Sequence, residues 1–264
     1  MALATRDETF LYRLADAAAR VVLPHFRSPL LVENKETVAN GRPFDPVTVA
    51  DRAAEAAMRE LIVATFPDDG ILGEEEGERN PDAEHIWILD PIDGTRSFIS
   101  GVPLWGTLIG LAVRGWPQLG LMAQPFTRER FSGDGRAARY QGPDGTRALK
   151  TRPCRQISTA TLFATSPDMF SASESERFGK LSSRVRLTRF GADCYAYCMV
   201  AAGFVDVVME AGLKPYDIAA LIPIVEGAGG RITDWQGNPA GKGGQVLACG
   251  DPGLHDHIVA LLGT

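Results

Sequence analysis

Residues 86–95 read Ile-Trp-Ile-Leu-Asp-Pro-Ile-Asp-Gly-Thr, an apolar run that ends in two carboxylates, a proline, a glycine and a hydroxyl. The four apolar residues predict a short buried strand, because such a run between polar residues is typical of a sheet interior. Asp90 and Asp93 follow at its end, where two close carboxylates repel each other unless a cation lies between them. Gly94 lets the backbone approach a ligand, and Thr95 begins a predicted helix whose free N–H groups can bind phosphate. The stretch therefore predicts a metal and phosphate site at a strand end.

The composition excludes several classes of protein. The chain has 264 residues and a formal net charge of −6, without a run of lysine and arginine, so a nucleic-acid surface is not expected. Its four cysteines show no CxxC spacing and predict no disulfide framework. We expect neither a secretory signal nor a membrane span, since the first residues are acidic and no apolar run is long enough. The composition favours a cytoplasmic protein that acts on small molecules.

The first half of the chain mixes helices with antiparallel strands. Helical spacing of apolar residues predicts a first helix that runs from Phe10 to Val22, with Thr5 and Glu8 as its capping box. A second helix is expected from Asp51 to Phe66. The segments 105–113 and 118–124 predict a hairpin around an Arg-Gly-Trp-Pro turn.

From residue 151 the pattern changes to strands that alternate with helices. Strands are predicted at 161–165, 185–190 and 205–209, and helices at 168–180, 193–202 and 218–227. Alternation of this kind predicts an α/β layer in which helices cover a sheet. We therefore expect an α+β subdomain over residues 1–148 that carries most metal ligands, and an α/β subdomain over residues 149–264 that carries the specificity residues.

Five acidic residues from distant parts of the chain are candidates for one metal site: Asp51, Glu74, Asp90, Asp93 and Asp217. Mg²⁺ prefers oxygen ligands, and the lack of histidine or cysteine partners disfavours zinc. Two such ions about 4 Å apart can activate a water and stabilise the leaving oxygen in an in-line displacement at phosphorus. Some of these residues also have a purely structural explanation. Asp51 can cap a helix, as can Thr95, and the dipole of a helix favours a carboxylate such as Asp217 at its N-terminus. Taken together, the five predict phosphoester hydrolysis.

Several separated motifs occur in one order along the chain: Asp45-x-Val-Thr-x-x-Asp51, Gly73-Glu74-Glu75, Asp90-Pro-Ile-Asp-Gly-Thr95, Asp217-Ile-Ala-Ala and Glu226-Gly-Ala-Gly-Gly. Together they resemble the inositol monophosphatase family over nearly the whole chain. The resemblance implies an α+β half followed by an α/β half in a layered αβαβα sandwich of the inositol monophosphatase and fructose bisphosphatase type. It also implies a homodimer and two or three Mg²⁺ ions in each active site.

The resemblance implies a metal-binding role for each matching residue. One Mg²⁺ ion would be held by Glu74, Asp90 and the carbonyl oxygen of Ile92. A second ion would be held by Asp90, Asp93 and Asp217. Glu74 would also reach a third ion through water.

The resemblance also implies catalytic and phosphate-binding residues. Thr95, oriented by Asp51, would help Glu74 to position and deprotonate the attacking water, without a covalent phosphoenzyme. The N–H groups of Gly94 and Thr95 would bind phosphate. The full set of expected substrate-binding residues is Asp93, Gly94, Thr95, Arg96, Ser97, Gly191, Asp193, Glu210 and Asp217.

The substrate is expected to be chosen by residues 191–198 and 210–217. These segments resemble the histidinol-phosphate phosphatase branch of the family, whose substrate carries an amine and an imidazole that are both able to be cationic. Asp193 and Glu210 can pair with those cations, whereas the alternative role of Asp193 is to cap a helix. Tyr195 and Tyr197 are expected to be packing residues. The preferred hypothesis is a magnesium-dependent histidinol-phosphatase.

Two other functions stay open at this point. The first is an inositol monophosphatase, and the second is a noncatalytic regulator that binds phosphate. Fructose bisphosphate or a nucleotide bisphosphate is disfavoured, because no strongly basic second phosphate site is present. The loop from Lys35 to Asp45 is longer than in inositol enzymes and is expected to cover the site, so Lys35 is given no role.

Overall fold

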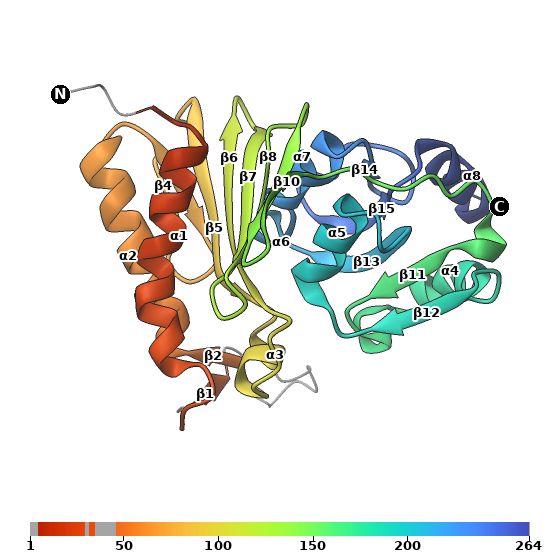
Figure 1. Cartoon of the computed structure of the whole chain (residues 1–264), viewed down its shortest axis with the longest axis horizontal. Helices are drawn as coiled ribbons and strands as arrows, with labels where there is room; N and C mark the ends of the chain where they lie inside the picture. The colour runs from red at the N-terminus through yellow and green to blue at the C-terminus, as the bar shows by residue number, and fades with distance from the viewer. Residues whose placement is uncertain (1–4, 30–31, 35–45, 264) are drawn as a thin grey trace.

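The computed structural model describes residues 5–29, 32–34 and 46–263, and the loop from Lys35 to Asp45 lies outside them. The chain forms five layers in the order helix, sheet, helix, sheet, helix (Figure 1). Helices α1 (Glu8–Val22) and α2 (Val49–Thr65) cover the outer face of an eight-stranded sheet. Helices α5 (Asp193–Ala201) and α7 (Leu221–Gly227) lie between the two sheets. Helices α4 (Ala172–Ser182) and α8 (Pro252–Leu262) cover the second sheet. The structure confirms the predicted αβαβα sandwich.

The first sheet has the order β10-β9-β8-β7-β6-β5-β3-β4. Its strands are β3 (Gly70–Gly73), β4 (Gly77–Arg79), β5 (His85–Asp93), β6 (Gly106–Val113), β7 (Trp116–Gln124), β8 (Glu129–Gly133), β9 (Ala138–Gly142) and β10 (Gly145–Ala148). In this sheet only β3 and β5 pair in parallel, and the other neighbouring strands are antiparallel. The antiparallel pairing of β6 with β7 confirms the predicted hairpin. A separate pair joins β1 (Val32–Asn34) to β2 (Pro46–Thr48).

The second sheet has five strands in the order β12-β11-β13-β15-β14. They are β11 (Thr161–Ala164), β12 (Leu187–Phe190), β13 (Val207–Leu213), β14 (Arg231–Thr233) and β15 (Gly244–Cys249). The parallel pairing of β11 with β12 and with β13 confirms the predicted α/β layer. The short helices are α3 (Thr95–Ile99), α6 (Pro215–Ile218), and the 3₁₀ turns Leu23–His25, Ile157–Thr159 and Pro167–Met169. The predicted division after residue 148 stays a prediction.

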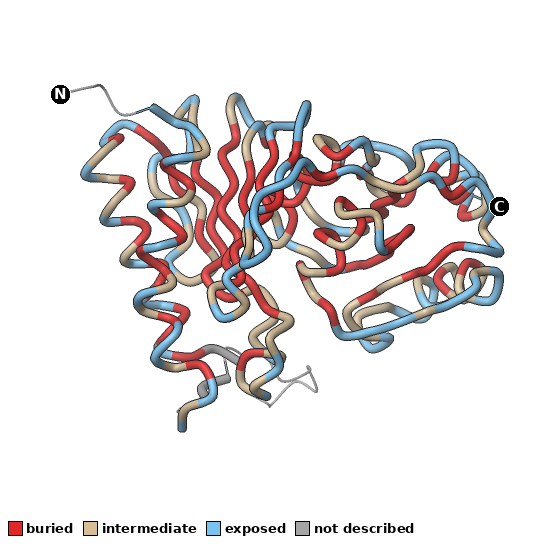
Figure 2. Tube along the Cα trace, in the orientation of Figure 1, coloured by how far each residue is buried: buried red, intermediate tan, exposed pale blue. Residues whose placement is uncertain are grey.

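Three large apolar clusters, and a small one around Ile88, Ala112 and Ala219, fill the spaces between the layers. One lies under α1 and α2, one between the two sheets, and one under α4 and α8. Figure 2 shows the buried stretches running along the central strands of the first sheet. The middle cluster joins Met122 and Phe131 of the first sheet to Ile222 of α7 and Val208 of the second. The two sheets are therefore held together by a continuous core.

A row of three glycines lets the middle helices approach the first sheet. Gly110, Gly120 and Gly133 stand side by side on β6, β7 and β8. A Cβ atom at Gly120 would lie 2.0 Å from the carbonyl oxygen of Ala220, and one at Gly133 would lie 2.4 Å from that of Pro223. Any larger residue would push α6 and α7 away from the sheet, so the row fixes where these helices sit.

The structure corrects several predicted boundaries. Asp7, rather than the box of Thr5 and Glu8, caps α1, because its carboxylate accepts the N–H of Phe10 at 3.1 Å. The predicted helix 218–227 is two helices, α6 and α7, and the helix predicted at 168–180 is α4 over Ala172–Ser182. Strand β5 continues past its apolar run to Asp93, with a break in its pairing between Asp90 and Asp93. This irregularity changes the direction in which the two carboxylates point, as bulges beside active sites commonly do.

Candidate active site

The parallel pairing of β3 and β5 brings the acidic loop to the end of the central strand. Gly73 pairs with Leu89, and the N–H of Glu74 donates to the Leu89 carbonyl oxygen at 3.2 Å. The carboxyl ends of parallel strands lie at the same edge of a sheet. Glu74, the residue after Gly73, therefore lies next to Asp90, the residue after Leu89. Glu74 and Asp90, which are 16 positions apart in the sequence, thus face one site.

Three carboxylates meet at this edge. Asp90, Asp93 and Asp217 each offer an oxygen, and these oxygens all lie within 4.8 Å of one another. Burial raises the pKa of Asp90 well above its usual range, and the charges of Glu74, Asp93 and Asp217 raise it further. Burial also raises the pKa of Asp93, with Asp193 and Asp217 adding to it. An all-oxygen set of mutually repelling carboxylates fits a hard divalent cation such as Mg²⁺.

Asp217 reaches the cluster from the middle helix layer. It stands in the first turn of α6, where its carboxylate accepts the N–H of Lys214 at 2.6 Å. The predicted place of Asp217 at a helix N-terminus is therefore correct, and this place does not compete with a metal role, since a carboxylate has two oxygens. The next residues pack against Gly110 of β6. The glycine row therefore also places Asp217 within reach of Asp90 and Asp93.

We expect the metal-free protein to lose stability as the pH rises from about 4 to about 7. Burial raises the pKa of Asp217 to about 7, above the ordinary value of 3.8. Between these values the folded state keeps a proton that the unfolded state releases, so the stabilising contribution is complete below the lower value and lost above the higher one. Thermal unfolding in a chelator at several pH values measures this slope, which Asp217→Asn should reduce. A midpoint independent of pH over this range would contradict the expectation.

Thr95 and Asp51 each make local hydrogen bonds that the sequence did not predict. The Thr95 hydroxyl donates to the Ile92 carbonyl oxygen at 3.1 Å. The Asp51 carboxylate accepts from the N–H and the hydroxyl of Thr48, at 2.9 and 2.6 Å. Thr48 and Asp51 form the capping box of α2 through one carboxylate oxygen of Asp51, and the predicted contact of Asp51 with Thr95 stays a prediction. Burial raises the pKa of Asp51, and the charge of Glu74 adds to it.

The predicted phosphate end of the site is the start of α3. Gly94 is its N-cap with φ +83°, a left-handed conformation that favours glycine. A Cβ atom at Gly94 would also lie 3.1 Å from the carboxyl carbon of Asp193. Ser97 lies on the same turn and donates to Asp193 at 3.0 Å, whereas the side chain of Arg96 is exposed.

A cavity of about 130 Å³ adjoins the carboxylates, and its walls include both predicted specificity residues. Asp193 follows Gly191, and both have positive φ, +45° and +85°. Burial raises the pKa of Asp193. Glu210 is only 2% exposed, and burial raises its pKa. The structure therefore brings both residues to one wall beside Asp93 and Asp217.

Two residues that sequence reasoning missed as site residues hold Glu210 in place. Thr165 donates to one carboxylate oxygen through its N–H and its hydroxyl, both at 2.7 Å. The hydroxyl of Tyr197 donates to the other oxygen at 2.8 Å. Tyr197 is fully buried, as expected of a packing residue, but it also lines the cavity. No local motif pointed to it, because its partner lies on a different element.

Glu55 is a further residue that the sequence did not single out. Its carboxylate is fully buried on α2 and accepts the N–H groups of Glu75 and Glu76 at 2.8 and 3.0 Å. Arg59, one turn later, pairs with it at 2.7 Å. A Cβ atom at Gly73 would lie 2.0 Å from Glu55, so the glycine is needed for this approach. Glu55 therefore fixes the loop that carries Glu74.

Replacing Glu55 with Gln should weaken the response to divalent cations. The amide places a donor where the loop N–H groups and Arg59 need an acceptor, so Glu74 loses its fixed position. Loss of such supporting contacts typically weakens metal binding about tenfold or more. Titration of Mg²⁺ by calorimetry measures the change, and Glu60→Gln, on the exposed face of the same helix, is the matched control. Unchanged Mg²⁺ affinity in Glu55→Gln would contradict the role.

Two further features bear on the class of protein. No helix in the described part of the chain combines the length and the apolar composition needed to cross a bilayer. Cys154, Cys194, Cys198 and Cys249 are all buried free thiols, as the cysteine spacing predicted.

Comparisons with known proteins agree with this geometry. The family described as "Inositol monophosphatase family" matches residues 5–263. The chain is 41% identical to the bifunctional phosphatase IMPL2, chloroplastic, of Arabidopsis thaliana, over 94% of this chain and 72% of the relative. It is 34% identical to a histidinol-phosphatase of Chlorobaculum parvum over 98% of both chains. Among solved structures, an inositol monophosphatase from Zymomonas mobilis has a TM-score of 0.85 and 42% identity, over 97% of both chains.

Proposed function

The chain belongs to the inositol monophosphatase family of phosphatases, and from this premise we propose that it is a magnesium-dependent phosphatase that prefers histidinol phosphate. The observation that supports this choice of substrate is the pair of carboxylates, Asp193 and Glu210, on the cavity wall beside the three clustered aspartates. Relatives named histidinol-phosphatase, at 34% and 37% identity, support it.

The proposed cofactor is two or three Mg²⁺ ions. Asp90, Asp93 and Asp217 would hold them, together with Glu74 and the carbonyl oxygen of Ile92. When bound, the cations would supply positive charge that favours ionisation of the attacking water and offsets the charge that develops on the phosphoryl oxygens. The raised pKa values of the buried aspartates support this proposal, because a bound cation offsets both the burial and the mutual repulsion that raise them.

The protein groups would divide the remaining work. The N–H groups of Gly94 and Thr95 would bind the phosphate at the start of α3. Glu74 and the Thr95 hydroxyl would orient the attacking water, and its proton would pass to Glu74, or to Asp51 through the Thr95 hydroxyl. Thr95 would have to turn away from the Ile92 carbonyl to present its oxygen or to meet Asp51, since its proton now points at Ile92.

Substrate choice would rest on charge. Histidinol phosphate carries an ammonium group and an imidazole that can be protonated. The Glu210 carboxylate accepts three hydrogen bonds from Thr165 and Tyr197, which fix it without neutralising its charge. Asp193 accepts one from Ser97 and keeps further acceptor capacity. A neutral polyol would gain less from these two charges than a cationic amino alcohol.

A panel of phosphate esters tests both levels of the proposal. Purified protein is assayed for phosphate release from histidinol phosphate, inositol monophosphate and a sugar phosphate, with Mg²⁺ and then with a chelator. We expect the fastest release from histidinol phosphate and none after chelation. Equal or faster release from inositol phosphate would overturn the substrate, and release from no ester would overturn the enzyme assignment.

Inositol monophosphate is the second candidate substrate, because the 42% identical solved relative is described as an inositol monophosphatase. We also propose that the protein works as a homodimer in the cytoplasm. The support for this is the family resemblance and the sequence composition. Light scattering coupled to size exclusion, at several concentrations, measures the oligomeric state directly.

A further inference from the structure

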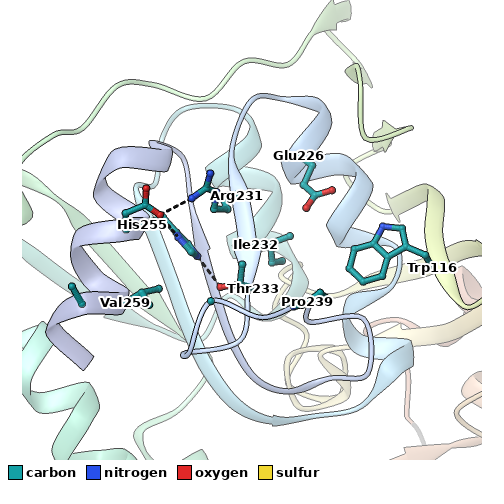
Figure 3. Close-up of a pocket in the computed structure, with 11 residues that line it drawn as sticks. Trp116, Glu226, Arg231, Ile232, Thr233, Pro239, His255 and Val259 are labelled. Atoms are coloured by element: carbon teal, nitrogen blue, oxygen red, sulfur yellow. Dashed lines mark hydrogen bonds and ion pairs between the residues drawn. The ribbon is translucent and has the colours of Figure 1, made fainter. Parts of the chain in front are cut away.

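Glu226 opens the Glu-Gly-Ala-Gly-Gly motif and takes no part in the site described above. Packing explains the glycines of the motif, since a Cβ atom at Gly227 would lie 2.4 Å from the Ala137 carbonyl oxygen and one at Gly230 2.8 Å from that of Cys249. Packing does not explain Glu226. Its carboxylate lines a cavity of about 480 Å³ bounded by α7, β14, α8 and the start of β7 (Figure 3).

The position of Glu226 is unfavourable for a carboxylate in three ways. It is half-buried, and burial raises its pKa. Within the described ranges, no hydrogen bond or ion pair joins its side chain to another residue. It also stands in the last turn of α7, where the helix dipole disfavours a negative charge. Arg231 is the cation on the cavity wall, but its guanidinium points to Asp256, at 2.5 Å.

An aromatic side chain lies at the same end of the cavity as Glu226. Trp116 is the partly exposed tryptophan of the chain, whereas Trp87, Trp105 and Trp235 are fully buried. Figure 3 shows its indole beside the Glu226 carboxylate, at the end of the cavity away from His255. A carboxylate and an indole on one cavity are the two groups that recognise organic cations, one by charge and one by its π face.

The opposite end of the cavity holds a second unsatisfied group. His255 is 2% exposed, and its Nε2 lies 2.8 Å from the Thr233 hydroxyl. That hydroxyl donates to the Asp234 carbonyl oxygen at 2.6 Å, so it must accept from Nε2–H. Nδ1 is then a buried acceptor without a donor, and it faces another acceptor, Asp256, at 3.5 Å. Unpaired groups of this kind are costly and are uncommon in a fold without a ligand.

We propose that this cavity binds a small organic ammonium compound with a flat ring, its cation opposite Glu226 and its ring against Trp116. The volume lies in the range of small-molecule sites, and the wall combines apolar side chains with charged and polar ones. The site is separate from the phosphatase cavity and does not depend on the proposed reaction.

Fluorine NMR of protein labelled with 5-fluorotryptophan tests the proposal. Four resonances are expected, and the one lost in Trp116→Phe belongs to Trp116. Tyramine, which carries an ammonium, a ring and a hydroxyl, should shift this resonance saturably. Tyrosol, which has a hydroxyl in place of the ammonium, should bind at least about tenfold more weakly, as should tyramine to Glu226→Gln. Asp193→Asn, in the phosphatase cavity, should leave the titration unchanged.

The stability of Glu226→Gln gives a second readout. If the carboxylate is kept for a ligand, the free protein should gain stability without its charge, with a Tm higher by about 1–3 °C. A lower Tm would show that Glu226 makes a structural contact and would overturn the proposal. It would also be overturned if tyramine up to millimolar concentrations left the Trp116 resonance unmoved, or bound Glu226→Gln as well as the parent protein.

Discussion

Replacing Asp93 with Asn should lower the rate of phosphate release by about 1000-fold or more, while the metal-free protein becomes more stable. Asp93 is expected to bind both the cation and, through it, the ester, so its charge is needed for turnover. Without a metal the same charge is destabilising, because burial and the neighbouring carboxylates raise its pKa well above its usual range. The Asn side chain can still accept the N–H of Cys194, now bonded at 2.7 Å, so the local fold is kept.

Two measurements separate this prediction from simple misfolding. Phosphate release is followed with saturating Mg²⁺, and thermal unfolding is followed in a chelator at about pH 8, where the carboxylates repel most strongly. Asp16→Asn, an exposed residue paired with Arg130, is the matched control and should change neither quantity. An Asp93→Asn protein with full activity would show that the cluster of three aspartates is not the reaction centre.

Replacing Asp193 with Asn should lower kcat/KM for histidinol phosphate by about 100-fold, the usual size of effect when one partner of a desolvated charge pair is removed. Inositol monophosphate has no cation to lose, so its kcat/KM should change much less. Apart from glycine, Asn tolerates the positive φ of this position better than other neutral residues, and it can still accept the Ser97 hydroxyl. The ratio of the two substrates therefore reports on charge rather than on folding.

The control for this experiment is an acidic residue beside the cavity that does not enter it. Asp168 is exposed and precedes Met169, which lines the cavity, so Asp168→Asn tests whether distant charge alone changes specificity. It should leave both substrates unaffected. Equal losses for both substrates in Asp193→Asn would mean that the residue supports the metal cluster, through its effect on Asp93, and does not select the substrate.

Much of the site was predictable because its residues follow recognisable local patterns. The apolar run before Asp90 identified the central strand, and the glycine after Asp93 marked the turn into α3. The convergence of Asp217 on these residues could be predicted only from the family resemblance. It depends on glycines in three neighbouring strands, and nothing in their sequence shows what lies above them.

The site residues that the sequence did not predict share one physical feature. Glu55, Thr165 and Tyr197 act through partners on other elements, at separations of 13 to 45 residues, which local spacing does not encode. The hydrogen bond from the Thr95 hydroxyl to the Ile92 carbonyl oxygen was also not predicted. The cap of α1 was misplaced because Thr5 and Asp7 are both good N-cap residues.

At the row formed by Gly110, Gly120 and Gly133, the backbone of the first sheet lies directly against the backbone of α6 and α7. A chimaera that joins the first half of one relative to the second half of another would inherit working ligands from both parents. It would nevertheless be inactive if either parent had larger side chains at this contact between the halves, here called the seam. Larger side chains would hold the two halves too far apart. The seam, more than the acidic motifs, therefore sets which relatives can exchange halves.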